Sequence, residues 1–178
     1  MYFNKQPVFF ADNANYLRLG DWRTHTNSLT EKLHAAKGDT ELELISQKWV
    51  LTSWWDTYLL GIKDGQVFQR EIIMKNHNTP YWYARTVIPY TSFHYEAVFF
   101  IRLENESIKN LIFGNDKVKR ISLIDYPVNE KSIEYHWVKK YLPHVNGVMW
   151  VRLAEYLYKN SASFYITEVL LPDLESLA

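Results

Sequence analysis

Two charged residues of opposite sign stand on strand faces that are otherwise apolar, and Glu168 is the first of them. Residues 163–171 are rich in β-branched, aromatic and apolar types, which is typical of a β-strand. Because strand side chains alternate between two faces, Glu168 shares its face with Ile166 and Leu170. A charge in such surroundings must be paired, shift its pKa or bind a ligand.

Arg70 is the second such residue. In the strand pattern of residues 67–74 it shares its face with Ile72 and Met74. Together with Glu168 it suggests a buried site for a small molecule that has an anionic end and a hydrogen-bond donor. The alternative is a structural role, in which Arg70 and Glu168 pair with each other or with other residues, because structural ion pairs produce the same pattern.

Arg85 offers a weaker indication of the same kind. It lies in a strand pattern over residues 81–88 and shares its face with Tyr83 and Val87. Either it contributes to the ligand site, or its guanidinium group reaches water from an aromatic face.

Other kinds of reactive site find no support in the sequence. The six histidines lack metal-ligand spacing such as H-E-x-x-H, and the six glycines form neither a P-loop nor a dinucleotide-binding fingerprint. No G-x-S-x-G motif occurs, and the absence of cysteine excludes disulfides, thiol catalysis and thiolate metal sites. We therefore expect a site without metal or cofactor.

Composition indicates a folded chain of one domain over residues 1–178. Hydrophobic residues make up 47% of the sequence, which is ample for a core. Lysine plus arginine equals aspartate plus glutamate, and this balance argues against a nucleic-acid partner. The chain has neither an apolar run long enough to span a membrane nor the layout of a signal peptide at its start. We expect a soluble, cytoplasmic protein.

The elements that would position the charged residues are mainly strands. Ser28 and Glu31 match a capping box, so a helix is expected from there to Gly38, with Leu29, Leu33 and Ala36 as its apolar stripe. A second helix is expected over 104–113. Residues 1–20 read as irregular, and 126–147 are ambiguous. The expected strands, of which the second and third and the last two form hairpins, are 41–51, 67–74, 81–88, 117–124, 148–158 and 162–171. This pattern predicts an α+β fold with a single antiparallel β-sheet and flanking helices.

Several short motifs follow one another in a recognisable order. They are D-W at 21–22, S-L-T at 28–30, F-Q-R-E-I-I at 68–73, P-Y-W at 80–82, A-R-T-V-I-P at 84–89, L-I-F at 111–113, M-W-V-R at 149–152 and T-E-V-L-L-P at 167–172. Together, over about residues 20–172, they resemble the chorismate lyase family.

The resemblance implies a cytoplasmic, cofactor-free carbon–oxygen lyase that splits chorismate into 4-hydroxybenzoate and pyruvate for ubiquinone biosynthesis. It also implies a closed pocket beneath helical flaps. In it Arg70 would bind the ring carboxylate with backbone amides at Leu29 and Ile108, and Glu168 would meet the 4-hydroxyl group. Arg85 would serve substrate entry or product exit.

The chain departs from the family pattern at three places. Lys109 stands where the family usually has glycine, which bears on the carboxylate-binding corner. Residues 151–154 read V-R-L-A rather than a small residue followed by arginines and a serine. The stretch 122–145 is longer than usual, as either an enlarged lid or a surface insertion.

Two other functions remain open from the sequence. Ligand-sensing domains of some transcription regulators share this fold, although the stretch before Ser28 is too short for the DNA-binding domain that accompanies them. A synthase of another hydroxybenzoate isomer is the second. A sensor of this kind would need a partner chain to supply its output. For the chain itself we expect a monomer whose partners are chorismate and 4-hydroxybenzoate.

Overall fold

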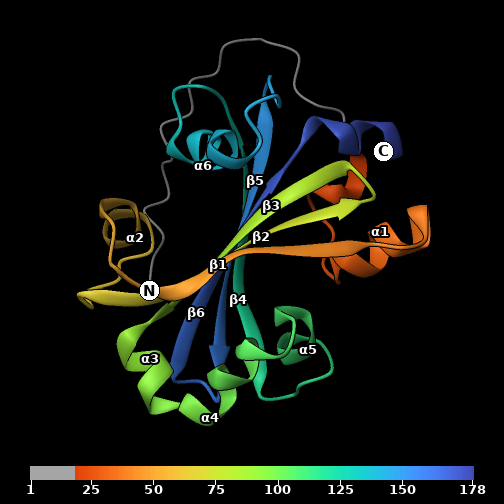
Figure 1. The fold of residues 1–178 in the computed structure, drawn as a ribbon. Coiled ribbons are helices and arrows are strands. Elements are labelled where there is room, and N and C mark those ends of the chain that lie inside the picture. The colour runs from red at the N-terminus through yellow and green to blue at the C-terminus, as the bar shows by residue number, and fades with distance from the viewer. Residues whose placement is uncertain (1–18) are drawn as a thin grey trace.

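A single antiparallel sheet of six strands organises residues 19–178, the part of the chain that the computed structural model describes (Figure 1). The strands are β1 (Glu41–Leu51), β2 (Gln66–Asn76), β3 (Thr79–Pro89), β4 (Val118–Val128), β5 (Met149–Tyr158) and β6 (Ala162–Leu170). Their order across the sheet is β1-β2-β3-β6-β5-β4, and every neighbouring pair is antiparallel. The predicted fold class and both predicted hairpins are confirmed.

Short helices connect the strands. The α-helices are α1 (Leu29–Lys37), α2 (Trp54–Leu59), α3 (Tyr90–Tyr95), α4 (Ala97–Phe100), α5 (Ile108–Ile112) and α6 (Ile133–Tyr141). The 3-10 helices are η1 (Gly20–Trp22), η2 (Ile101–Glu104) and η3 (Pro172–Leu177). The prediction of an irregular stretch over 1–20 falls almost entirely on residues 1–18, which lie outside the described range.

The two predicted helices differ in part from those observed. The first begins after Ser28, whose hydroxyl accepts a hydrogen bond from the Glu31 amide, and ends at Gly38, where φ is 78°. Ala36, however, is exposed and does not belong to the buried stripe. The second was expected to run unbroken over 104–113, which is wrong, because the chain leaves η2 and Ser107 caps a new helix, α5.

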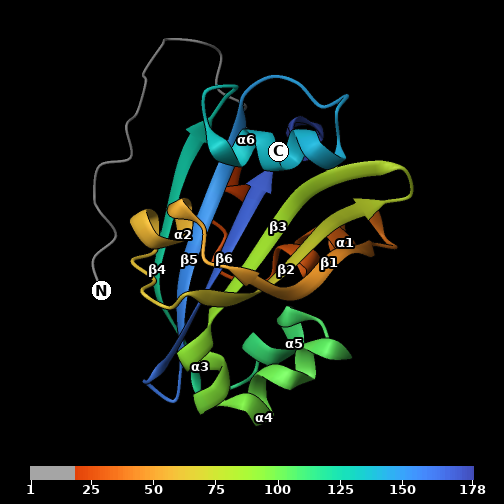
Figure 2. The same cartoon turned by 60° about the vertical axis from the view of Figure 1, so that its left-hand side comes forward.

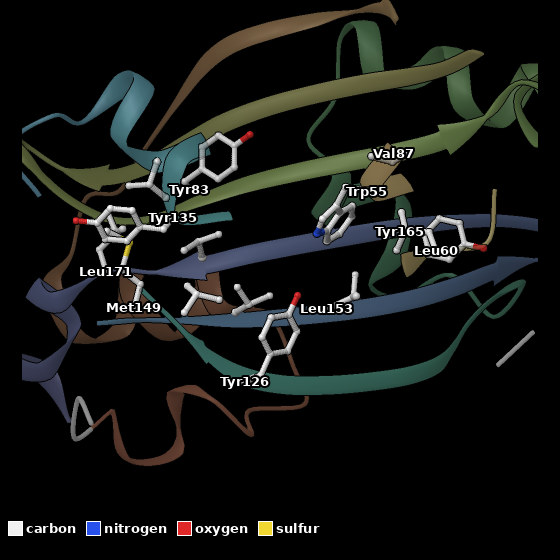
Figure 3. Packing of buried hydrophobic residues seen from close by; sticks show 14 of the residues in the cluster. Trp55, Leu60, Tyr83, Val87, Tyr126, Tyr135, Met149, Leu153, Tyr165 and Leu171 are labelled. Atoms are coloured by element: carbon white, nitrogen blue, oxygen red, sulfur yellow. The ribbon is translucent and has the colours of Figure 1, made fainter. Parts of the chain in front are cut away.

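The helices α2 and α6 pack on one face of the sheet. Trp55 of α2 and Tyr135 of α6 lie among sheet residues such as Tyr83 and Leu153 in one large buried cluster (Figure 3). The long stretch 122–145 contains α6 and the end of β4. It is therefore part of the core on this face, and it is neither a lid on the site nor a surface insertion.

The opposite face of the sheet carries α1, α3, α4 and α5. In both views α5 lies on the side of the sheet away from α6 (Figures 1 and 2). Two separate buried clusters form there. One joins η1, α1 and η3 to the sheet through residues such as Trp22 and Leu33. The other joins α4, η2 and α5 to the sheet through Phe100 and Leu111. The packing is interrupted between the two clusters, and the candidate site lies in this interruption.

Candidate active site

A cavity of about 300 Å³ lies between the two clusters, which suits one small ring with its substituents. Side chains of the central strands β2, β3, β6 and β5 form its floor, and the first turns of α1 and α5 form its roof. The charged residues that line it are Arg70, Lys109, Arg120, Arg152 and Glu168.

Arg70 reaches the cavity from β2 and is only 7% exposed. Its Nη1 atom donates hydrogen bonds to the backbone carbonyls of Leu103, at 3.2 Å, and Glu106, at 2.8 Å. Among the described residues no carboxylate pairs with it and no acceptor meets Nε or Nη2. Burial lowers the pKa of this guanidinium group, and an anionic ligand would supply the missing countercharge.

Glu168 reaches the same cavity from β6. Its Oε2 atom lies 3.1 Å from Nη1 of Arg152, so Arg152, and not Arg70, is its ion-pair partner. Burial raises the pKa of the Glu168 carboxyl group, and the nearby charges of Arg152 and Arg120 partly oppose this rise. Glu168 thus keeps one structural partner and still faces the cavity.

The register of the sheet fixes the separation of Arg70 and Glu168. Arg70 is opposite Thr86 on β3, and Thr86 is opposite Ile166 on β6, two residues before Glu168. With strands about 4.8 Å apart and residues about 3.4 Å apart along a strand, the two Cα atoms are roughly 12 Å apart. Two long side chains on one face can therefore approach opposite ends of a single six-membered ring.

Leu29 and Ile108 occupy equivalent positions in the roof, as the first residues of α1 and α5. The hydroxyl groups of Ser28 and Ser107 accept hydrogen bonds from the third amide of each helix, at Glu31 and Asn110. The amides of Leu29 and Ile108 therefore have no acceptor within their own helices, and such amides bind anions well.

Arg85 does not reach the cavity, because its side chain lies on the opposite face of the sheet. Nη1 lies 2.6 Å from Oδ1 of Asp56, and Nη2 lies 3.0 Å from Oδ2. Nε and Nη2 also donate to Oε1 of Gln69. Burial by itself would raise the pKa of Asp56, but Arg85 holds it below the ordinary value. Arg85 is thus a buried partner of Asp56, and its guanidinium group does not reach water.

Sequence reasoning did not single out Arg120 and Arg152. Arg152 sits between Trp150 and Ala154 on one face of β5, so strand alternation could have identified it. Arg120 precedes an irregularity in the pairing of β4 between Arg120 and Ser122, and this irregularity breaks the alternation on which such reasoning depends.

Lys109 joins the two parts of the roof. Its Nζ atom lies 2.9 Å from Oε1 of Glu31, so an ion pair connects α5 to α1 above the cavity. This pairing also explains why Glu31 does not complete the predicted capping box.

Two further findings concern the residues 19–178 as a whole. They contain no group of three or more His, Cys, Asp or Glu side chains placed to hold a metal ion. They also contain no helix of the length and apolar character needed to cross a membrane.

Comparisons of the sequence with known proteins show its family. The family model described as chorismate lyase matches residues 11–175. A probable chorismate pyruvate-lyase of Pseudoalteromonas atlantica is 27% identical over 163 residues, which cover 86% of this chain and 79% of the relative. One from a Shewanella strain is 24% identical over 172 residues, which cover 94% and 89%.

Two solved structures of other proteins have a similar fold. A GntR-family transcriptional regulator from Bacillus cereus has a TM-score of 0.54 at 16% identity, covering 75% of this chain and 92% of that one. The C-terminal domain of Yurk from Bacillus subtilis has a TM-score of 0.53 at 15% identity, covering 74% and 89%. At such identities the likeness shows the fold alone.

Proposed function

Because the chain belongs to the chorismate lyase family, we propose that it eliminates pyruvate from chorismate to give 4-hydroxybenzoate. The observation that carries this proposal is one cavity lined by Arg70 and Glu168, which project from strands on either side of β3. The names of the curated relatives, probable chorismate pyruvate-lyases, support a lyase activity. A cytoplasmic location and a role in ubiquinone biosynthesis are parts of the same proposal.

Arg70 binds the ring carboxylate in this proposal. Nε and Nη2 of its guanidinium group, which have no acceptor among residues 19–178, can form a two-point contact with a planar carboxylate. The amides of Leu29 and Ile108 approach the same anion from the roof. Lys109 takes no part in this corner through its side chain, because Nζ is bound to Glu31.

Glu168 receives the opposite end of the ring, where the 4-hydroxyl group is. In the reaction the ether bond at ring carbon C3 breaks, a proton leaves ring carbon C4, and the ring becomes aromatic. Glu168 either accepts a hydrogen bond from the hydroxyl group or removes the proton from C4; in the first case the proton passes to the departing enol. Because aromatisation favours the product, the enzyme needs mainly to orient the substrate and to stabilise shifting charge.

Incubation of purified protein with chorismate in the presence of a chelator tests the proposal. Chromatography should show 4-hydroxybenzoate, formed together with an equal amount of pyruvate and much faster than in buffer alone. An isomeric hydroxybenzoate would support the synthase and contradict the lyase proposed here.

A non-catalytic sensor is the second candidate, favoured by the fold that the chain shares with transcriptional regulators. It predicts tight binding of 4-hydroxybenzoate without any turnover of chorismate. Calorimetric titration beside the chromatographic assay separates the two candidates, because only the lyase consumes chorismate.

A further inference from the structure

The charges in the cavity exceed what a ring with one carboxylate requires. Three guanidinium groups, those of Arg70, Arg120 and Arg152, line it together with one carboxylate, Glu168. Lys109 also lines it but is already paired with Glu31. The lining therefore carries two uncompensated positive charges, and Arg70 accounts for only one of them.

Arg152 is a buried cation with unused hydrogen-bond donors. It is 3% exposed, and its Nη2 atom donates to the backbone carbonyl of His25 at 2.6 Å. Nη1 lies 3.1 Å from Glu168, but the alignment is poor, and neither Nη1 nor Nε has a hydrogen-bond partner in the described part of the chain. Buried donors are normally satisfied, so this pair of nitrogens points to a missing acceptor.

Arg120 is opposite Tyr156 on β5, four residues along that strand from Arg152, and its side chain lines the same cavity. Its Nη1 atom donates to the backbone carbonyl of Thr26 at 3.0 Å, and a further hydrogen bond reaches Tyr156. No carboxylate pairs with it among residues 19–178. Arg120 and Tyr156 also line a shallower pocket that adjoins the cavity. The guanidinium group thus lies between the cavity and the exterior.

We propose that Arg120 and Arg152 bind the second carboxylate of chorismate, the one carried by the enolpyruvyl group. This inference rests on the function proposed above. The enolpyruvyl ether is attached to ring carbon C3, next to the carbon that bears the 4-hydroxyl group. Glu168 takes that hydroxyl group, and Arg152 is directly opposite Glu168 on the neighbouring strand. Arg152 is therefore placed to receive a group carried by the neighbouring ring carbon, and Arg120 lines the same cavity.

Both arginines also act on the leaving group in this arrangement. When the C3–O bond breaks, its electron pair passes to the enol oxygen, and the proton from C4 ends on Glu168 or on the departing enolpyruvate. If Glu168 holds that proton, the enolate of pyruvate leaves and takes up one proton at its methylene carbon. If the enol oxygen holds it, the enol gives up that proton while its methylene carbon takes one up, and both routes end in pyruvate. Fixed positive charges beside the enolpyruvyl group stabilise the negative charge that develops there.

The variant Arg120→Gln tests the proposal, because Arg120 is partly exposed and its loss leaves the pair of Arg152 and Glu168 in place. Two ligands are titrated by calorimetry: 4-hydroxybenzoate, with one carboxylate, and 3-(carboxymethoxy)-4-hydroxybenzoate, whose ether carboxylate imitates the enolpyruvyl group. We expect the variant to lose about tenfold or more in affinity for the second ligand, or about 1.4 kcal/mol. Its affinity for the first should change less than threefold.

Two controls complete the experiment. Lys119→Gln removes a positive charge from the same strand. Nζ of Lys119 donates to Oδ1 of Asn160, and Lys119 does not line the cavity, so this variant should leave both affinities unchanged. Arg120→Lys should recover part of the lost affinity. Equal losses for both ligands, or no loss for either, would overturn the proposal.

The wild-type protein supplies a test that needs no variant. It should bind the dicarboxylate analogue at least as tightly as 4-hydroxybenzoate, and weaker binding of the analogue would overturn the second-carboxylate site. Turnover of chorismate by the wild type is measured in parallel. If the wild type turns over chorismate and Arg120→Gln binds the dicarboxylate analogue as tightly as the wild type does, only this inference is refuted. If the wild type does not turn over chorismate, the proposed function itself is refuted.

Discussion

Arg70 is expected to supply most of the affinity for a carboxylated ring, because it is buried and no described carboxylate compensates its charge. Arg70→Ala should weaken the binding of 4-hydroxybenzoate by about 3 kcal/mol, the range for breaking a desolvated charge pair. Calorimetry measures the affinity, and a thermal melt shows whether the variant is folded. A variant that unfolds readily but binds normally when folded would instead assign Arg70 a structural role.

Glu168 should give the reaction a characteristic dependence on pH. Burial raises the pKa of its carboxyl group above the ordinary 4.5, and the proposed mechanism needs the carboxylate. The acidic limb of kcat/KM, which reports the free enzyme, should therefore lie above pH 4.5. Since the charge of Arg120 lowers this pKa, Arg120→Gln should move the limb to higher pH.

The variant Glu168→Gln should fold but convert chorismate slowly. A rate equal to that of the wild type would show that Glu168 takes no part in the mechanism.

The helices of the roof are joined by the ion pair of Lys109 and Glu31. The glycine that the family resemblance implies at position 109 could not form this pair. Both partners are partly exposed, so the pair contributes at most about 1 kcal/mol to stability. Its larger effect should be on opening of the roof. Lys109→Ala should release 4-hydroxybenzoate a few times faster in stopped-flow measurements, and Glu31→Ala should match it. An unchanged release rate in both variants would show that the roof opens elsewhere.

Strand alternation predicted the face of the site, but neither it nor the two predicted hairpins could show which strands far apart in sequence pair with each other. It placed Arg70 and Glu168 on apolar faces correctly, because the side-chain period depends only on the local chain. That β3 lies between them follows from the pairing of β3 with β6, which is far away in sequence. That Arg85 faces away follows from the register of the hairpin, in which Arg85 is opposite Glu71. The helix α2 was missed, although Ser53 and Asp56 form a capping box that the sequence displays.

The two faces of the sheet have different roles in the molecule. One face holds the cavity between two small clusters, and the other holds the largest buried cluster together with the buried pair of Arg85 and Asp56. Packing and charge pairs on the second face need not change when a ligand enters or leaves. The structure places Arg85 on this second face, in a buried pair with Asp56. The family resemblance instead implies that Arg85 serves substrate entry or product exit.

The variant Arg85→Ala distinguishes a structural role of Arg85 from a role in ligand passage. If the pair with Asp56 is structural, the variant leaves a buried carboxylate without its partner, and the free energy of unfolding should fall by about 3–5 kcal/mol. Denaturant titration measures this change. The folded variant, kept at low temperature, should bind 4-hydroxybenzoate within twofold of the wild type, because the side chain lies on the far side of the sheet. A large loss of affinity or a changed release rate with little loss of stability would instead give Arg85 the role in ligand passage that the family resemblance implies.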